Sequence, residues 1–316
     1  MSGLLKYMIK KVIMGIPIVF VVSLSIFLIM QAAPGDPIDL MLPPGARVSP
    51  ERVEELRRKW GLDKPVYIQF FYWLFNIFRG NFGISIITKQ PVSLLIIERL
   101  PYTLELTFTS LILSYIIGVP LGMIAAIKRG SVYDNLLMSI SMFFYSMPTY
   151  WLGVMFMLMF SLRLGWFPIS GYTGLRSLIL PMLTLALPYV ASVARLVRTE
   201  MIDVLTEDYV RTAWAKGLPP KVVLLKHGLR NALIPVTVMF FLQLPWLIGG
   251  AVVVETVFAW PGMGRLLYIS ILKQDFPVIQ AIVFIITILT VISNTLGDIV
   301  LAFLDPRIRV EIEKGA

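Results

Sequence analysis

Five polar side chains lie within or beside long uncharged runs of the sequence, where they could bind a polar molecule or exchange a proton. They are Glu105, Gln243, Glu255, Asn294 and Asp298. Ionisable groups at membrane depth usually face a bundle interior or a water-filled pathway. Three of the five are close to the ends of their runs, where a solvated group at the membrane surface is the competing interpretation. Gln243 and Asn294 lie deeper, where a hydrogen bond between helices competes with a substrate contact.

A basic stretch between two uncharged runs suggests a second kind of site. Residues 208–235 read DYVRTAWAKGLPPKVVLLKHGLRNALIP and include the cations Arg211, Lys216, Lys221, Lys226 and Arg230. Each of these would cost about 2.5–3.5 kcal/mol or more in the core of a bilayer. The stretch must therefore lie in water, held between two membrane spans.

The order of residues in this stretch predicts two helices joined by a bend. Residues 201–216 contain neither Pro nor Gly, and Gly217 suits the position just past a helix, where a positive φ is often needed. Pro219 and Pro220 cannot continue the first helix but fit the opening turn of a second, over residues 221–230.

One face of the first predicted helix carries small residues. Tyr209, Ala213 and Gly217 recur at four-residue spacing, so they share a face that another backbone could approach closely. This face could dock a partner. A basic loop that does no more than orient two spans is the alternative.

The composition indicates an integral membrane protein with several spans. Of the 316 residues, 57% are hydrophobic and 15% are charged, whereas soluble domains are about a quarter charged. The net charge of +9 arises mainly at the ends of the apolar runs, which favours membrane orientation over binding of nucleic acid. With no cysteine and a single histidine, His227, the chain has no basis for a disulfide framework, a thiolate metal site or a His-rich metal site.

The sequence contains no motif for nucleotide hydrolysis. A P-loop needs Gly-Lys before Ser or Thr, and the dipeptide Gly-Lys does not occur. The hydrolase motifs H-E-x-x-H and G-x-S-x-G are absent as well. We therefore expect a non-catalytic chain without a cofactor. Any ATP that drives it must be hydrolysed by another polypeptide.

Six uncharged runs are long enough to cross a bilayer. They cover residues 12–30, 106–127, 136–162, 177–194, 232–254 and 276–297. Fifteen lysines and arginines flank these runs on the side of the basic stretch, against four in the short loops opposite. The positive-inside rule thus predicts that both termini and the basic stretch are cytoplasmic.

The first run could instead be a signal peptide. Its apolar core is longer than the roughly 7–15 residues usual for one, and the following QAAPGDP has no convincing cleavage pattern. We therefore expect an uncleaved first span.

Residues 34–99 form the predicted external loop, which is too long to lack structure. Ser49-Pro50 predicts the start of a helix that ends at Gly61. Residues 66–78, VYIQFFYWLFNIF, are too short to span and predict a helix along the outer leaflet, or one packed on the spans.

A second external element is predicted between the fifth and sixth runs. Trp260, Pro261 and Gly262 break any helix, and residues 266–272 allow about two further turns. Irregular backbone at membrane depth must line a cavity or be covered by protein, so we expect a short helix that dips into the outer mouth.

The basic stretch resembles the cytoplasmic EAA loop of ABC importer permeases. Ala213, Gly217 and Leu229 match its second Ala, its Gly and its Leu. Arg211, Thr212, His227 and Arg230 depart from the general pattern, but DYVRTA-x-AKGL followed by H-x-LRNALIP is typical of the dipeptide, oligopeptide and nickel subfamily. The residues that the resemblance places in an ATPase-coupling loop are Asp208, Tyr209, Arg211, Ala213, Ala215, Lys216, Gly217, Leu218, His227, Leu229, Arg230 and Asn231.

The resemblance extends over nearly the whole chain. GLDKP, an aromatic run and RGNFGIS follow the external region of the subfamily, although Asn81 replaces the usual Asp of Gly-Asp-x-Gly. The order E-x-VF-x-WPG-x-G and the later LDPRIR match as well. Candidates for a pathway or an outer gate are Gln243, Glu255, Trp260, Arg265 and Asn294.

The resemblance implies an all-α membrane protein with six spans, in the manner of type I ABC importer permeases. Residues 1–33 would hold the first span, 34–99 the external loop, and 100–316 a five-helix core with the coupling loop at 201–231. Besides membrane lipid, the implied partners are a homologous permease subunit, two ATPase subunits and an external substrate-binding protein. The implied function is import of dipeptides or oligopeptides across the cell membrane by alternating access.

Other functions remain open at this point. The same architecture could import nickel, glutathione or another small solute. A secondary transporter should show an intramembrane ionisable relay and an inverted repeat, and no convincing repeat is present. A membrane assembly subunit that transports nothing is the third possibility.

Overall fold

The computed structural model describes residues 2–32, 51, 54–55, 57–58 and 63–304, with side chains from residue 7 onward. The predicted helix start at Ser49-Pro50, its end at Gly61 and residues 305–309 of the segment LDPRIR lie outside these residues. The described part is helical, and its only β feature is an isolated antiparallel bridge between Ile84 and Pro91.

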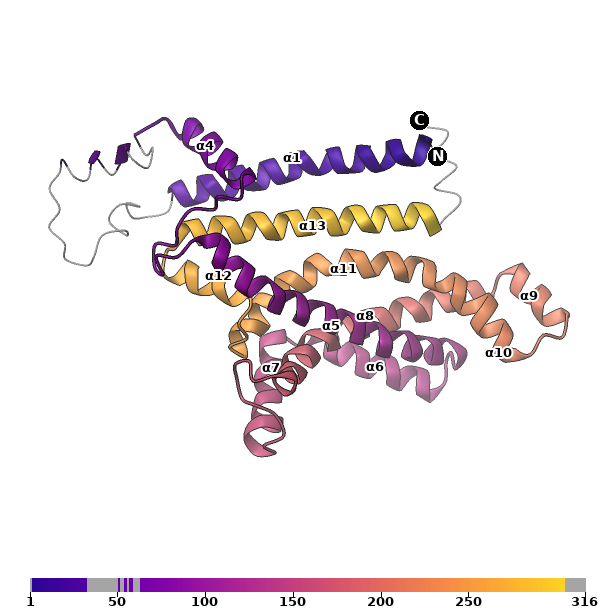
Figure 1. Ribbon diagram of the computed structural model, residues 1–316. Helices are drawn as coiled ribbons and strands as arrows, with labels where there is room; N and C mark the ends of the chain where they lie inside the picture. The colour runs from indigo at the N-terminus through magenta and orange to yellow at the C-terminus, as the bar shows by residue number, and fades with distance from the viewer. Residues whose placement is uncertain (1, 33–50, 52–53, 56, 59–62, 305–316) are drawn as a thin grey trace.

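Five long helices run side by side as a bundle (Figure 1). They are α1 (Ser2–Ala32), α5 (Val92–Ile127), α8 (Leu175–Leu205), α11 (Arg230–Val257) and α13 (Phe276–Leu304). Each contains an apolar segment long enough to cross a membrane. These helices coincide with five of the six predicted spans.

The remaining span is divided into two helices. We predicted one continuous helix over residues 136–162, but α6 (Val132–Ser146) and α7 (Thr149–Phe156) meet at an angle of 100°. A π-helix, η1 (Met157–Arg163), continues α7. The physical reason for the break is Pro148, which lacks an N–H and holds Met147 in an extended conformation with φ −77° and ψ 132°.

The tightest helix packing in the bundle joins α5 to α8. Gly118 and Gly122 of α5 face Val193, Ala194 and Val197 of α8, and a Cβ added at Gly122 would lie 2.4 Å from the Ala194 carbonyl oxygen. Small residues four apart let membrane helices approach closely. This contact gives α8 its central, mostly buried place in the bundle.

Two short helices lie at one end of the bundle (Figure 1). Helix α4 has the predicted bounds, Val66–Phe78, and packs its Phe70 ring edge-on against Phe20 and Phe27 of α1. Helix α12 (Met263–Leu272) confirms the short helix expected after the Trp-Pro-Gly break.

The opposite end of the bundle carries the basic stretch. Helix α9 (Asp208–Ala215) and the short α10 (Pro220–Val222) lie there, as do the start of α1 and the end of α13 (Figure 1). A π-helix, η2 (Val223–Leu229), joins α10 to α11. The basic stretch, the start of the first span and the end of the last span therefore lie at the same end of the bundle, as the six-span prediction requires.

Candidate functional site

The bend at the basic end of the bundle is formed by Gly217. Helix α9 ends at Ala215, and Gly217 has φ +72°, in the left-handed region that disfavours residues with a Cβ. Its N–H donates to the Trp214 carbonyl at 2.9 Å, and the next N–H, of Leu218, reaches the Ala213 carbonyl. The predicted positive φ is confirmed.

A small apolar core holds the two arms of the bend together. Val210 and Ala213 of α9 pack on Val223 of η2, with Leu205 and Leu218 at the edge. Ala213 is only 4% exposed. The close approach expected at Ala213 therefore occurs within this chain, where Val223 of η2 packs on it, so Ala213 does not belong to a surface that a partner could contact.

A hydrogen bond closes the bend on its outer side. The Asn231 amide donates to the Tyr209 hydroxyl at 2.9 Å and to the His227 carbonyl at 3.0 Å. Asn231 lies in the first turn of α11, and Tyr209 belongs to α9. The bend is thus tied to the membrane span that follows it.

The second arm does not end where we predicted. Instead of stopping at Arg230, the helix runs without interruption from Pro220 to Val257. The π-helical turn accommodates Gly228, which is buried and lies close to Met201 of α8. The bend is therefore built directly onto a membrane span.

The water-facing surface of the bend is basic and aromatic. Its exposed members are Asp208, Tyr209, Arg211, Trp214, Ala215, Lys216, Lys221, Lys226 and Arg230, while Leu218, His227 and Leu229 are half-buried. Arg211 and Asp208 approach to 3.5 Å with both side chains largely exposed, so their pairing adds little stability. Most of these cations are therefore available to a partner protein that contacts this end of the bundle.

A second cluster forms around Glu255 at the opposite end of the bundle. Glu255 is fully buried. Its Oε1 accepts from the Thr103 hydroxyl at 2.7 Å, and its Oε2 accepts from the Arg265 N–H at 2.9 Å. The Thr103 hydroxyl oxygen in turn accepts from the Met263 N–H at 2.8 Å. A carboxylate of α11 thus caps the start of α12, where backbone N–H groups favour negative charge.

Neighbouring residues fit the Glu255 carboxylate closely. A Cβ added at Gly262 would lie 2.2 Å from Oε1, and one at Gly264 would lie 2.9 Å from Oε2. Trp260 is buried, and its indole N–H donates to the Tyr102 carbonyl at 3.0 Å. The residues of the E-x-VF-x-WPG-x-G motif therefore pack together around the Glu255 carboxylate. The alternative interpretation, a Glu255 side chain in contact with solvent, is wrong. The Arg265 guanidinium donates to the Ala259 carbonyl.

The other candidate pathway residues do not gather into one site. Gln243 is buried, and its Oε1 has no hydrogen-bond partner. Asn294 is exposed on α13, so a helix–helix hydrogen bond within the described chain is not its role. Asp298 pairs with Lys11 of α1 at 2.7 Å. Glu105 is half-buried, and its backbone carbonyl accepts from Thr109.

Sequence reasoning missed a buried ion pair near the basic end of the bundle. Asp134 of α6 is 2% exposed and accepts from Arg198 of α8 at 2.6 and 2.7 Å, and from the Gly130 N–H at 2.9 Å. A sequence signal for the position of Asp134 was available: Ser131 and Asp134, three residues apart, have the spacing of a capping box at the start of a helix. Ser131 is indeed the N-cap of α6.

A second missed carboxylate anchors the segment between α4 and α5. Asp275, buried between α12 and α13, accepts from the Ser85 hydroxyl at 2.5 Å and from the Ile86 N–H at 2.9 Å. In the same loop the Asn81 side-chain oxygen accepts from the Gly83 N–H at 3.1 Å. An amide oxygen therefore provides an acceptor at the position where the subfamily usually has Asp.

The described part of the chain is thus a bundle of helices apolar and long enough to cross a membrane, with the basic bend at one end and the capped helix α12 at the other. Residues 4–107 match the N-terminal part, and residues 118–310 the main part, of the family described as binding-protein-dependent transport system inner membrane component. The chain belongs to this family.

Curated relatives of the chain cover nearly its full length. It is 42% identical over 313 residues to the oligopeptide transport system permease protein AppB of Bacillus subtilis strain 168, covering 96% of this chain and 98% of that one. It is also 42% identical over 306 residues to the glutathione transport system permease protein GsiC of Escherichia coli strain K12, covering 97% and 99%.

A solved structure confirms the fold. The MetNI methionine ABC transporter, in an inward-facing conformation, contains a chain that aligns with a TM-score of 0.58 and 22% identity, covering 67% of this chain and 96% of that one. The protein is therefore a permease of the type I ABC importer fold, a multi-pass inner-membrane component of a multi-part transport system. Permeases of this family are non-catalytic membrane subunits.

Proposed function

We propose that this permease imports short peptides, using ATP that separate subunits hydrolyse. The observation that carries the proposal is full-length similarity to permeases named for oligopeptides and for glutathione, two peptide-type solutes. Import of nickel is the alternative that this observation disfavours.

The proposed assembly contains a homologous second permease, two ATPase subunits and an external binding protein. In it the bend around Gly217 docks an ATPase. Support comes from the exposed Tyr209 and Trp214, which add aromatic area to a basic surface. The core around Ala213 and the bond from Tyr209 to Asn231 make the bend a single unit with α11. Closure of the two ATPase subunits would then move α11, and this motion would open the solute pathway to one side of the membrane and close it to the other.

The opposite end of the bundle receives the loaded binding protein in this proposal. Helices α4 and α12 are both too short to span, and both lie at that end (Figure 1). Glu255 and Asp275 fix α12 to α5, α11 and the external loop. Contact with α12 would therefore be transmitted directly to several spans.

Single cysteines test the proposed orientation, with both termini and the bend in the cytoplasm. The chain has no native cysteine, so Arg58→Cys and Lys216→Cys each introduce one thiol. In intact cells, an impermeant thiol reagent should label the cysteine at position 58 and not the one at 216, and membrane disruption should expose both. The reverse pattern in intact cells would invert the topology.

Gly217→Val tests the coupling role of the bend. Nothing lies within 4 Å of an added Cβ, so the expected cost is the strain of a β-branched residue at φ +72°, about 1–2 kcal/mol. We expect normal membrane insertion but weaker co-purification of the ATPases and loss of hydrolysis stimulated by the loaded binding protein.

Gly217→Asn is the matched control, because Asn tolerates the left-handed region far better than Val. It should retain most of the stimulated hydrolysis and peptide uptake. Full activity of the Val variant would show that the stretch is only an orienting basic loop.

A further inference from the structure

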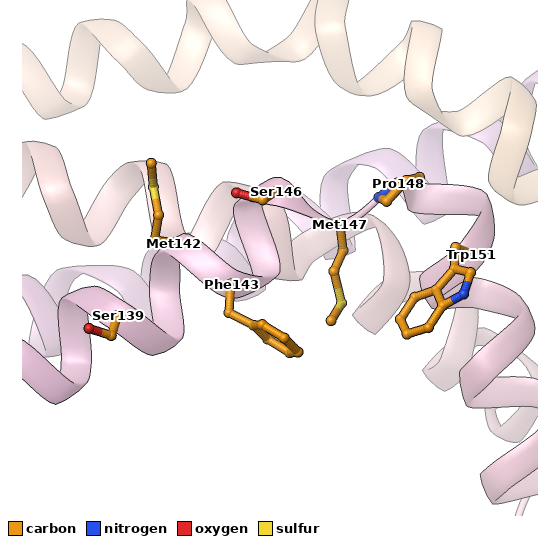
Figure 2. A pocket seen from close by; sticks show the side chains of 7 residues that line it. All are labelled: Ser139, Met142, Phe143, Ser146, Met147, Pro148 and Trp151. Carbon is orange, nitrogen blue, oxygen red and sulfur yellow. The ribbon is translucent and has the colours of Figure 1, made fainter.

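The break between α6 and α7 borders an open cavity, a hollow that this chain walls on one side only and that the preceding sites do not use. Its volume is about 690 Å³, and it is lined by Ser139, Met142, Phe143, Ser146, Met147, Pro148 and Trp151. Figure 2 shows Phe143, Met147 and Trp151 pointing to the same side of the bend. Its mixture of apolar walls and a few hydroxyls is typical of sites that hold small ligands.

The break lies at membrane depth. Helix α6 starts next to Lys128 and Arg129 and has 15 residues, which corresponds to about 22 Å along its axis. The hydrocarbon core of a bilayer is about 30 Å thick. A span that begins at one membrane surface is therefore interrupted before it reaches the other.

Backbone groups at the break require water or a polar partner. The first backbone bond of α7 runs from the Leu152 N–H to the Pro148 carbonyl at 3.0 Å, so the amides of residues 149–151 have no intrahelical acceptor. No side chain caps this end of the helix. Lipid cannot satisfy such groups, and broken helices at membrane depth occur where protein covers them or where they line a water-filled cavity.

The side chains around the break are also unsuited to lipid alone. Ser139 and Ser146, seven residues apart on one face of α6, are both exposed. Phe143 and Trp151 also line the cavity, and their side chains are 59% and 43% exposed. Hydroxyls alternating with sulfur and aromatic groups can contact both the amide oxygens and the apolar side chains of a peptide.

We infer that the cavity at the α6–α7 break is the water-filled part of the solute route that this subunit contributes, and that it takes a short peptide-like solute. The inference rests on the proposed function and extends it to named residues. The wall is open in a single chain, so the second permease subunit would complete it. Discontinuous helices form solute sites in other transporters for the same physical reason.

Cysteine accessibility in the assembled complex tests the inference. Ser139→Cys and Ser146→Cys place a thiol in the cavity of a chain that has no other. Ile140→Cys is the matched control, because Ile140 is 53% exposed on the same helix but does not line the cavity. The thiolate is the reactive form, and it is disfavoured in apolar surroundings.

We expect a small charged methanethiosulfonate reagent to modify the cysteines at 139 and 146 at least about tenfold faster than the one at 140 in proteoliposomes of the complete complex. Modification at 146 should block peptide uptake, and loaded binding protein with ATP should slow it. Equal rates at all three positions would show that lipid or protein fills the cavity and would overturn the inference. Rapid modification at 146 with full uptake would overturn it as well, by placing the route elsewhere.

Uptake by the unsubstituted complex separates this inference from the proposed function. If that complex hydrolyses ATP but moves no peptide, the proposed substrate class is wrong. The modification rates still show whether the cavity holds water. If the complex imports peptide and the cysteines at 139 and 146 react no faster than the control, only the inference fails.

Discussion

Replacing Glu255 by Ala should nearly abolish peptide uptake while leaving the subunit in the membrane. The substitution removes the acceptor of the Thr103 hydroxyl and of the Arg265 N–H inside a buried site. Each unsatisfied donor costs about 1–3 kcal/mol, and even 1–2 kcal/mol changes a conformational ratio about 5–30-fold. Helix α12 should therefore lose its fixed position over α5 and α11.

The measurement is uptake together with limited proteolysis of the face that carries α12. We expect new cleavage near the start of α12 in Glu255→Ala, and a smaller effect in Glu255→Gln, which retains an acceptor oxygen. Glu98→Gln is the control, because Glu98 is an exposed carboxylate on α5, the helix that carries Thr103. Wild-type uptake by Glu255→Ala would mean that the position of α12 does not matter for transport.

Replacing Asp134 by Ala should produce the largest loss of stability at the basic end of the bundle. The substitution leaves Arg198 without its two bonds at 2.6 and 2.7 Å and also frees the Gly130 N–H. Removing one partner of a buried ion pair costs about 3–5 kcal/mol. The lower end of this range applies, because the Arg198 side chain is 27% exposed. Thermal unfolding in detergent should therefore begin several degrees lower.

A double substitution identifies the cause of that loss. Asp134→Ala with Arg198→Ala removes both charges, so it should be less destabilising than the sum of the single substitutions. Glu54→Ala, at an exposed pair with Arg58 at 3.4 Å, should change stability by less than about 1 kcal/mol. Additive losses in the double variant would show that the two groups stabilise the bundle independently.

Much of the fold could be predicted because membrane physics limits the choices. Runs of about 20 apolar residues must become helices, and cations must remain in water. The helix over Val66–Phe78 and the positive φ of Gly217 were also predictable, since local residues determine both.

The bend at Pro148 could not be predicted from proline alone. Pro101, Pro120 and Pro181 lie within continuous helices, because neighbouring helices can satisfy the backbone groups that a proline frees. Whether a proline kinks a membrane helix or breaks it depends on that packing. The sequence does not contain this information in any local form.

The role of Glu255 was missed for a related reason. Its partners, Thr103 and Arg265, belong to other elements, and they make a buried carboxylate tolerable. The small residues Gly262 and Gly264 were visible in the sequence, but only the structure shows that the carboxylate needs the space they leave. The inward direction of Ala213 is a similar case, since four-residue spacing identifies a face without saying what covers it.

The uninterrupted helix from Pro220 to Val257 has a mechanical consequence. Its 38 residues extend over about 57 Å, with the π-helical turn after Val222 at one end and Glu255 at the other. It can act as a lever whose pivot lies beside the bend. A tilt of about 5° at the pivot moves the far end by about 5 Å, roughly the pitch of one helical turn. A modest rotation driven from the end that carries the bend would therefore be enough to displace the capped start of α12 by about one helical turn.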